Sequence, residues 1–202
     1  MLVHSASGPG ATRAGIERAA LRLFVTRGLR GTTVRDIATH AGVAEGTLYR
    51  HWRSKQDLAR SVFRGCAETV AAELRTAAAA ERTPTAKLAA AVRALFRCAR
   101  DERLLYEILV LPPSRETQAF FSRATSPADV LAGIIEEGSD QGDFALAIDP
   151  RLAAECILGS INRIAVYRRL GILPRRLAEY EDEVSSGLLG TLRALRRRRR
   201  SA

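Results

Sequence analysis

The sequence of 202 residues predicts an all-α protein, and three observations lead to this prediction. Ala, Leu, Arg and Glu, which are strong helix formers, are frequent throughout the chain. Apolar residues recur at helical spacing, and few stretches show the alternation of a β-strand. Apolar residues make up 47% of the chain, an ordinary share for a globular protein. We therefore expect packed helices and no extensive disorder.

A first helix is predicted from about Thr12 to Arg27, after a flexible tail formed by residues 1–12. Its apolar residues share one face, as in an amphipathic helix; they are Ile16, Ala20, Leu23 and Phe24. Gly28 follows in the position where glycine ends a helix in a left-handed conformation. A short loop should lead from it to Thr33.

Two short helices follow, joined by a turn that contains glycine. Thr33 is placed to cap the first of them, and Asp36 favours the positive end of its dipole. The turn is Ala41-Gly42-Val43, and the next helix begins near Glu45. Leu48 and Trp52, four residues apart, should form the buried face of that helix. This arrangement is the helix-turn-helix pattern.

The remaining two thirds of the chain predict further helices. They are expected at Lys55 to Ala80, Thr85 to Arg100, Asp101 to Leu111, Arg115 to Glu137 with a kink near Pro127, Pro150 to Leu170, and Leu177 to Leu195. Gly138 to Asp149 is polar and is predicted as a loop. The expected division is therefore residues 13–57 for the helix-turn-helix domain, 58–195 for a larger helical domain, and 196–202 for a basic tail.

Positive charge is concentrated at the two ends of the chain. Residues 1–60 hold ten Lys and Arg against four Asp and Glu, residues 61–195 hold seventeen against eighteen, and Arg196 to Arg200 are all basic. A basic module joined to a neutral body is typical of a protein that binds nucleic acid and has a second function elsewhere. The arginine run itself is interpreted as a solvated end, with added phosphate binding as the alternative.

The three cysteines are Cys66, Cys98 and Cys156, and they match neither a zinc spacing nor a disulfide framework. Each lies among apolar residues and is predicted as a small buried hydrophobic residue. No apolar run approaches the roughly 20 residues that span a bilayer, and the first residues do not resemble a signal peptide. We expect a cytoplasmic protein with no membrane, metal or cofactor partner.

The polar side chains around the turn are the candidate DNA-binding residues. Near the start of the helix that begins at Glu45, Glu45, Gly46 and Arg50 can approach base edges in a major groove. Phosphate donors are expected from Thr47, Tyr49, His51 and Lys55, with Arg35 contacting a base or a phosphate and Thr33 at the start of the preceding helix. The alternative is a solvated polar face with no ligand. The basic surroundings and the turn favour DNA.

Residues 33–58, TVRDIATHAGVAEGTLYRHWRSKQDL, resemble the DNA-binding signature of the TetR family of transcriptional regulators. The shared positions are Ile37-Ala38, Ala41-Gly42-Val43, Gly46 to Tyr49, Ser54-Lys55 and Asp57. The resemblance covers about 26 residues and is specific, whereas the rest of the chain carries no motif of similar strength.

The resemblance implies a homodimeric repressor of about nine helices per subunit that binds a palindromic operator. It also implies a C-terminal domain that pairs through its last two helices and binds a small-molecule effector. Candidate contacts for an apolar effector are Phe96, Tyr106, Glu107, Phe120, Phe121 and Asn162, with Glu107 and Asn162 as its polar groups. For any single aromatic residue of this set, the alternative of a core residue is favoured over a ligand contact.

The chain departs from the family pattern at two adjacent positions. Ala44 stands where the family usually has the serine that caps the recognition helix, at a cost of about 1 kcal/mol. Glu45 beside phosphates is also unusual, although it could accept from a cytosine amino group. The aromatic pair of the family is His51-Trp52 here.

Apolar stripes on the last two predicted helices indicate how two copies could pair. They consist of Leu152, Cys156, Gly159 and Val166 on one helix and Val184, Leu188, Leu192 and Leu195 on the other, with small residues at Ser160 and Gly187. The alternative is a core within one chain. Pairing is favoured because one helix-turn-helix contacts too few bases to be selective.

Three other functions are alternatives to a repressor. An enzyme is disfavoured, because the chain has no nucleophile–base motif, no glycine-rich phosphate loop and no metal spacing. A nonspecific DNA-binding protein would carry the same basic module. A transcriptional activator of the same fold would have the same sequence features, so that alternative stays open.

Overall fold

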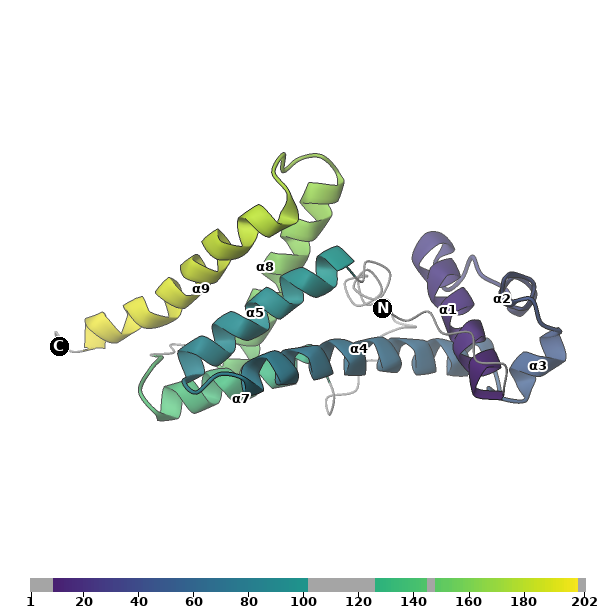
Figure 1. Ribbon diagram of the computed structural model, residues 1–202, viewed down its shortest axis with the longest axis horizontal. Coiled ribbons are helices and arrows are strands. Elements are labelled where there is room, and N and C mark those ends of the chain that lie inside the picture. Colours follow the sequence, from purple (N-terminus) through teal and green to yellow (C-terminus); the bar gives the residue numbers. More distant parts are fainter. Residues whose placement is uncertain (1–8, 102–125, 145–147, 200–202) are drawn as a thin grey trace. The chain divides into compact units, whose positions relative to one another are not determined.

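The computed structural model describes residues 9–101, 126–144 and 148–199, with backbone alone for 9–11 and 191–199. All the regular structure in these ranges is helical (Figure 1). The helices are α1 (Pro9–Arg27), α2 (Val34–Ala41), α3 (Glu45–Tyr49), α4 (Lys55–Ala79), α5 (Pro84–Asp101), α7 (Pro127–Asp140), α8 (Pro150–Arg169) and α9 (Leu177–Arg199). The predicted all-α class is confirmed. The described chain forms two compact units, one ending at Cys66 and the other beginning at Ala67.

The first unit contains α1, α2, α3 and the first three turns of α4. Helix α1 packs on α2, and α2 packs on α3. The apolar stripe predicted on α1 is buried, with Ile16 and Ala20 fully inaccessible to solvent and Phe24 nearly so. Helix α1 begins at Pro9, within the predicted tail, so the predicted start at Thr12 was wrong. Gly28 ends α1 with φ +73°, as predicted. Apolar burial of this kind, rather than intrinsic propensity, is what stabilises short helices such as α2 and α3.

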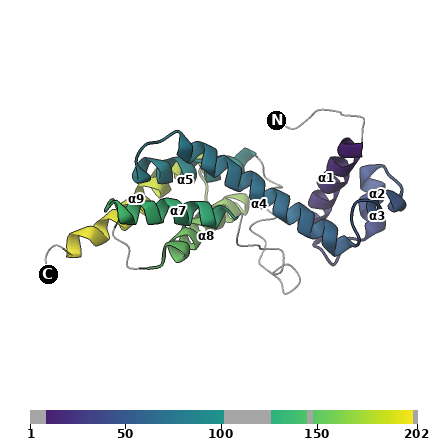
Figure 2. The same ribbon diagram turned by 90° about the horizontal axis from the view of Figure 1, so that it is seen from below.

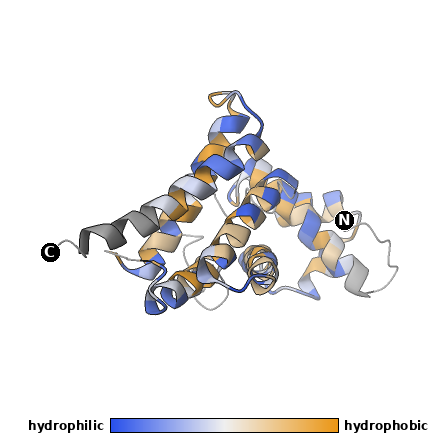
Figure 3. Ribbon diagram, turned by 60° about the vertical axis from the view of Figure 1, so that its left-hand side comes forward, coloured by the Kyte–Doolittle hydropathy of each residue, from blue (hydrophilic) through white to orange (hydrophobic). Residues whose placement is uncertain are grey.

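The second unit is a bundle of α5, α7, α8 and α9 with the remainder of α4. Helix α5 contacts α7, α8 and α9, and α7 packs along α8 (Figure 2). Its core is continuous along α5, where Leu88, Leu95 and Phe96 are almost completely buried. Figure 3 shows hydrophobic (orange) and hydrophilic (blue) residues interspersed along the helices. Burial of the apolar ones in a common core is the pattern of surface helices.

Helix α7 begins and ends at residues that the sequence prediction placed differently. Ser126 caps it through a capping box with Asp129, and Pro127 occupies its first turn. A new helix therefore starts where a kink within a longer helix was predicted. Residues 115–125 of that predicted helix lie outside the described residues. The predicted helix from Asp101 to Leu111 also lies outside them, except for Asp101. Proline is favoured at the first helical position because its missing N–H has no partner there.

The predicted loop from Gly138 was also wrong, because α7 continues to Asp140. Gly138 is buried under the ring of Phe144, and the backbone N–H groups of Asp143 and Phe144 both donate to its carbonyl. The chain then turns at Gly142, with φ +75°. Tertiary packing thus keeps a glycine inside the helix at a position where sequence pattern alone favoured a break.

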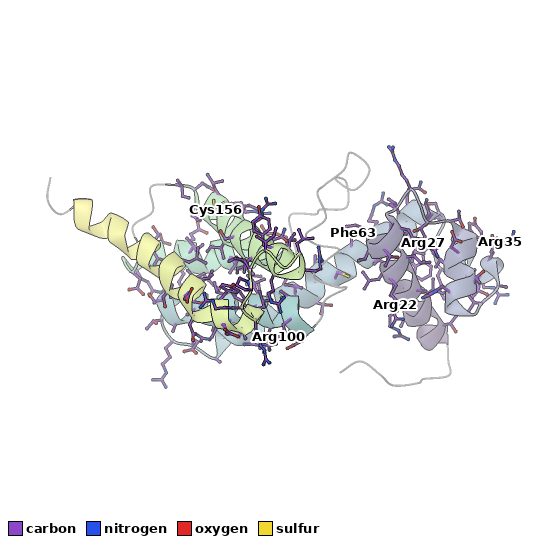
Figure 4. The ribbon with its side chains drawn as sticks, turned by 90° about the horizontal axis from the view of Figure 1, so that it is seen from above. Arg22, Arg27, Arg35, Phe63, Arg100 and Cys156 are labelled. Atoms are coloured by element: carbon purple, nitrogen blue, oxygen red, sulfur yellow. The ribbon has the colours of Figure 1, made fainter. Side chains whose placement is uncertain are left out.

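The cysteines differ in their surroundings. Cys66 and Cys98 are buried, as predicted, whereas Cys156 is exposed on α8 (Figure 4). The buried-residue prediction for Cys156 is therefore wrong, because its side chain lies on a different face of α8 from the buried Ile157 and Ile161. Burial, with a smaller effect from the Glu17 carboxylate, raises the pKa of the Cys66 thiol to about 12. None of the helices in the described ranges is both long and apolar enough to cross a membrane.

Candidate nucleic-acid interface

The predicted helix-turn-helix is formed by α2, the turn at Gly42 and α3. The turn requires glycine, because Gly42 has φ +69° and ends α2 in the left-handed conformation. Its backbone N–H donates to Thr39 O, and the N–H of Val43 donates to Ala38 O. On the inner side, Leu48 and Trp52 are buried as predicted. These contacts fix the direction in which α3 presents its other face.

The outward face of α3 is polar and accessible. Glu45, Gly46, Tyr49 and Arg50 are exposed, while Thr47 and His51 are half-buried. The Tyr49 side chain is 58% exposed, unusual for an aromatic residue on a short helix. Among the described residues, none forms a hydrogen bond or ion pair with the side chains of Glu45, Tyr49 or Arg50. These groups are therefore available to an external partner.

No side chain caps α3. Ala44 has the extended backbone of an N-cap residue, with φ −71° and ψ 147°, but its methyl group accepts no hydrogen bond. The uncapped start predicted from the sequence is therefore present. The helix itself is only five residues long, although the N–H groups of His51 and Trp52 still donate to Leu48 O.

At the start of α2, Thr33 is committed to the helix cap. Its hydroxyl donates to Asp36 Oδ2 at 2.6 Å and accepts from the Asp36 N–H at 3.1 Å. The Thr33 hydrogen bonds, with smaller contributions from the Arg27 and Arg35 charges, lower the pKa of the Asp36 carboxyl. Because the folded-state pKa is lowered, this cap is intact above the ordinary carboxyl pKa and is lost as pH falls through the lowered value.

Arg35 projects from the outer edge of its unit, away from α1 (Figure 4). Its side chain is exposed and is not hydrogen-bonded to any other described residue. Arg27, by contrast, lies 3.8 Å from Asp36 through its guanidinium. Arg35 therefore keeps its donors free of the described residues in the first turn of α2.

His51 is packed rather than freely solvated. Its ring lies 5.4 Å from the Trp52 ring, centroid to centroid, at an interplanar angle of 57°. The Arg13 guanidinium lies 5.4 Å from the centroid of Trp52, within cation–π range. The aromatic pair thus joins the end of α3 to α1, and it holds the His51 ring in a defined position.

Lys55 differs from the other candidates because its ammonium group already has partners. It donates to Leu29 O at 2.7 Å and to Thr32 O at 2.8 Å. The surrounding loop is tightly packed, since Thr32 is completely buried and a Cβ at Gly31 would overlap Arg27 O. The sequence prediction missed the packing role of Gly31 and Thr32 in this loop. The only sequence signal for that role is the isolated glycine before two threonines.

The predicted effector contacts are placed only in part. Tyr106, Glu107, Phe120 and Phe121 lie outside the described residues. Phe96 is buried in the core, and Asn162 on α8 has a buried side-chain oxygen without a hydrogen-bond partner among the described residues. Such an atom costs free energy unless a partner is supplied.

A separate groove of about 480 Å³ lies in the second unit, and neither Phe96 nor Asn162, the two predicted effector contacts within the described residues, lines it. Its lining residues come from α4, α5, the N-cap of α7 and α7 itself. They are Arg75, Ala78, Ala79, Lys87, Ser126, Asp129, Val130, Gly133, Ile134 and Glu137. The Lys87 ammonium donates to both Glu137 oxygens, at 2.7 and 2.9 Å, and thereby lowers the pKa of that carboxyl. The groove therefore combines an apolar floor with a neutralised ion pair.

Known proteins resemble this chain in sequence and in fold. The family described as "Bacterial regulatory proteins, tetR family" matches residues 16–62. The HTH-type transcriptional repressor KstR2 of Rhodococcus jostii (strain RHA1) is 30% identical over 152 residues, which cover 73% of this chain and 74% of the relative.

Two solved structures share the fold. The transcriptional regulator FadR from Bacillus subtilis, in complex with stearoyl-CoA, has a TM-score of 0.76 at 23% identity and covers 87% of this chain and 97% of that chain. AibR in complex with isovaleryl coenzyme A and operator DNA has a TM-score of 0.66 at 20% identity, over 90% of this chain and 98% of that chain. Together with the sequence matches and the helix-turn-helix geometry, they lead to one conclusion: the chain belongs to the TetR family of bacterial regulatory proteins.

Proposed function

We propose that the protein is a transcriptional repressor that binds a palindromic operator as a homodimer and is released by a small apolar effector. The observation that carries the proposal is the free, polar face of α3, held outward by buried Leu48 and Trp52. Family membership supports DNA binding and repression, since KstR2 is itself named a transcriptional repressor. The operator symmetry and the nature of the effector are the further steps of the proposal.

In this proposal, base edges are contacted by Arg50 and Glu45, whose side chains are exposed and unpartnered within the described chain. A guanidinium that binds guanine in two places and a carboxylate that accepts from cytosine are matched to opposite members of one base pair. The exposed backbone at Gly46 allows close approach, since a Cβ added there would meet nothing within 4 Å. These residues would decide which sequence is bound.

Phosphate contacts are assigned to the residues that flank this centre. Thr47, Tyr49, His51 and Arg35 carry donors at both ends of the outward face, and phosphate contacts fix the register of a protein on DNA. Thr33 would contribute less, because its hydroxyl proton is already donated to Asp36. Lys55 is a separate case, because its ammonium group is already bonded to two carbonyl groups of the chain.

The effector is proposed to bind in the second unit near Phe96 and Asn162. The buried side-chain oxygen of Asn162, which has no hydrogen-bond partner within the described part of the chain, supports this site, since a bound molecule with a donor group would satisfy it. FadR and AibR are described with stearoyl-CoA and isovaleryl coenzyme A, so these two acyl compounds are suitable first probes for release from DNA.

The test is selection of DNA by the purified protein from a random pool, followed by the same selection with Arg50→Ala. The wild-type chain should recover one palindrome, and Arg50→Ala should fold normally but recover a relaxed consensus, with discrimination at the affected base pair reduced by about 1–3 kcal/mol. Tyr49→Phe serves as the matched control, because loss of a phosphate donor weakens all sequences alike.

Two outcomes would contradict the proposal. Recovery of no consensus by the wild-type chain would favour a nonspecific DNA-binding protein. An unchanged consensus with Arg50→Ala would refute the assigned base contact. A reporter gene placed behind the selected palindrome separates a repressor from an activator, because its expression should rise when the gene for this protein is deleted.

A further inference from the structure

The loop between α1 and α2 is held by one side chain of its own and by one from α4. From within the loop, the Thr32 hydroxyl donates to Gly28 O at 2.8 Å and lies 3.3 Å from Leu23 O. From α4, the Lys55 ammonium donates to Leu29 O and Thr32 O. Lys55 is therefore bonded to residues 23 and 26 positions earlier in the chain, in a part-buried setting.

The electrostatics of the loop suit a cation at this place. The last carbonyl groups of α1 carry the negative end of its dipole, and a lysine beside a helix C-terminus is stabilised by it. Charged donors also make stronger hydrogen bonds to carbonyl groups than neutral donors do. Removal of the ammonium would leave two carbonyl groups in a part-buried loop without their charged partner.

The position of the loop matters because it leads directly into the cap of α2. Thr33, the N-cap residue, follows Thr32, and Arg35 lies in the first turn after it. The loop has no spare room, since a Cβ at Gly31 would overlap the Arg27 carbonyl. A displacement of the Lys55 partners would therefore displace the start of α2.

We propose that Lys55 is a positioning residue that ties the first turn of α4 to the α1–α2 loop and so fixes α2 for DNA binding, rather than a phosphate ligand. A lysine has three N–H donors, and two of them are used here. A phosphate contact that moved the ammonium group away from the loop would break both bonds, and only the third donor is left while they are kept. The inference rests on the proposed DNA binding for its functional consequence. The two hydrogen bonds from Lys55 to Leu29 O and Thr32 O, here called the clamp, are a property of the free protein.

The first experiment uses the DNA-free protein. Lys55→Met keeps an unbranched side chain of similar length and removes all three donors. Amide hydrogen exchange should then accelerate at residues 29–36 while the core of α1 stays protected. Arg53→Met is the matched control, since it removes one positive charge two residues from Lys55. The Arg53 side chain is exposed and has no partner in the described chain. Arg53→Met should leave exchange in the loop unchanged.

The second experiment measures affinity for the duplex recovered from the random pool over a range of salt concentrations. Lys55→Met should weaken binding about tenfold at every salt concentration, with the slope of log K against log salt unchanged. A phosphate ligand would instead reduce that slope by about 0.9. Lys55→Arg, which keeps a cation and its donors, should recover most of the lost affinity and restore slow exchange.

A reduced slope with unchanged loop exchange would overturn the proposal in favour of a phosphate contact. Wild-type affinity of folded Lys55→Met, despite a lower Tm, would overturn it in favour of stability alone. If Lys55→Met does not fold, the NMR resonance of the Lys55 ammonium group in the wild-type protein is the test. The proposal requires slow exchange of its protons with solvent in the absence of DNA and the same chemical shift when DNA is added. A resonance that appears only with DNA refutes the proposal. A chain that binds no DNA would refute the proposed function, while exchange in the free protein still tests the clamp.

Discussion

Gly133 and Gly138 lie on the same helix, α7, in opposite surroundings. A Cβ added at Gly133 would meet nothing within 4 Å, whereas one added at Gly138 would overlap the Phe144 ring and lie 3.0 Å from Pro84 Cβ. Both have helical backbone, so left-handed strain has no part in the difference. The pair therefore separates the entropic cost of a helical glycine from the packing requirement for one.

Gly138→Ala should lower the free energy of unfolding by about 1–3 kcal/mol, because the added methyl group overpacks the contact with Phe144. Gly133→Ala is the control and should raise it by about 0.5–1 kcal/mol through the better helix propensity of alanine. Urea unfolding at one fixed protein concentration measures both. Equal effects of the two substitutions would contradict the packing role of Gly138.

At the scale of elements, helix boundaries set by local chemistry were predictable and those set by distant contacts were not. The ends of α1 and α2 followed from Gly28 and Gly42, which act within a few residues, and α4 begins at Lys55 as predicted. The continuation of α7 past Gly138 depends on Phe144 and Pro84, which no local pattern brings together. The same limit applies to the candidate nucleic-acid interface. The outward face of α3 was predicted, but the partners of Lys55, 23 and 26 residues away, were not.

The missing cap of α3 gives a prediction at this scale. Ala44→Ser should stabilise the protein by about 0.5–1 kcal/mol, because the new hydroxyl can accept from the N–H of Gly46 or Thr47. The gain should appear as a higher Tm and as slower amide exchange in these two residues. Ala44→Val supplies the control, since its side chain cannot accept a hydrogen bond. Unchanged exchange in Ala44→Ser would mean that the first turn of α3 is already ordered by other contacts.

For the whole molecule, α8 has apolar residues on two sides. Ala153, Ala154, Ile157 and Ile161 are buried within the chain. On other faces Leu152 is 53% exposed, and Cys156 and Gly159 are also accessible. Beyond the end of α8, Leu170 and Ile172 are exposed in the connection to α9. A second apolar face on a helix that already has a core favours pairing with another copy over a core within one chain.

The protein should sediment as a dimer, and Leu152→Glu should shift it towards monomer, because a charge would be buried without a partner in the proposed interface. Ala72→Glu, at an exposed position on α4, adds the same charge elsewhere and should leave the dimer intact. Cys156 supplies an independent measurement: a short bifunctional thiol reagent should link two copies through it, since Cys66 and Cys98 are buried. A monomer in the wild-type chain would remove the basis for a palindromic operator.

The burial of the first turns of α4 has a consequence for how this protein can be divided and recombined. Leu58, Val62 and Cys66 are buried, and the first unit extends to Cys66, whereas a cut at residue 57 would follow the motif and discard them. The family match itself continues to residue 62. A fragment meant to fold alone therefore has to end after Cys66, inside α4, rather than at the end of the motif. A chimaera that exchanges DNA specificity with a relative has to be joined at the same place, in helical register.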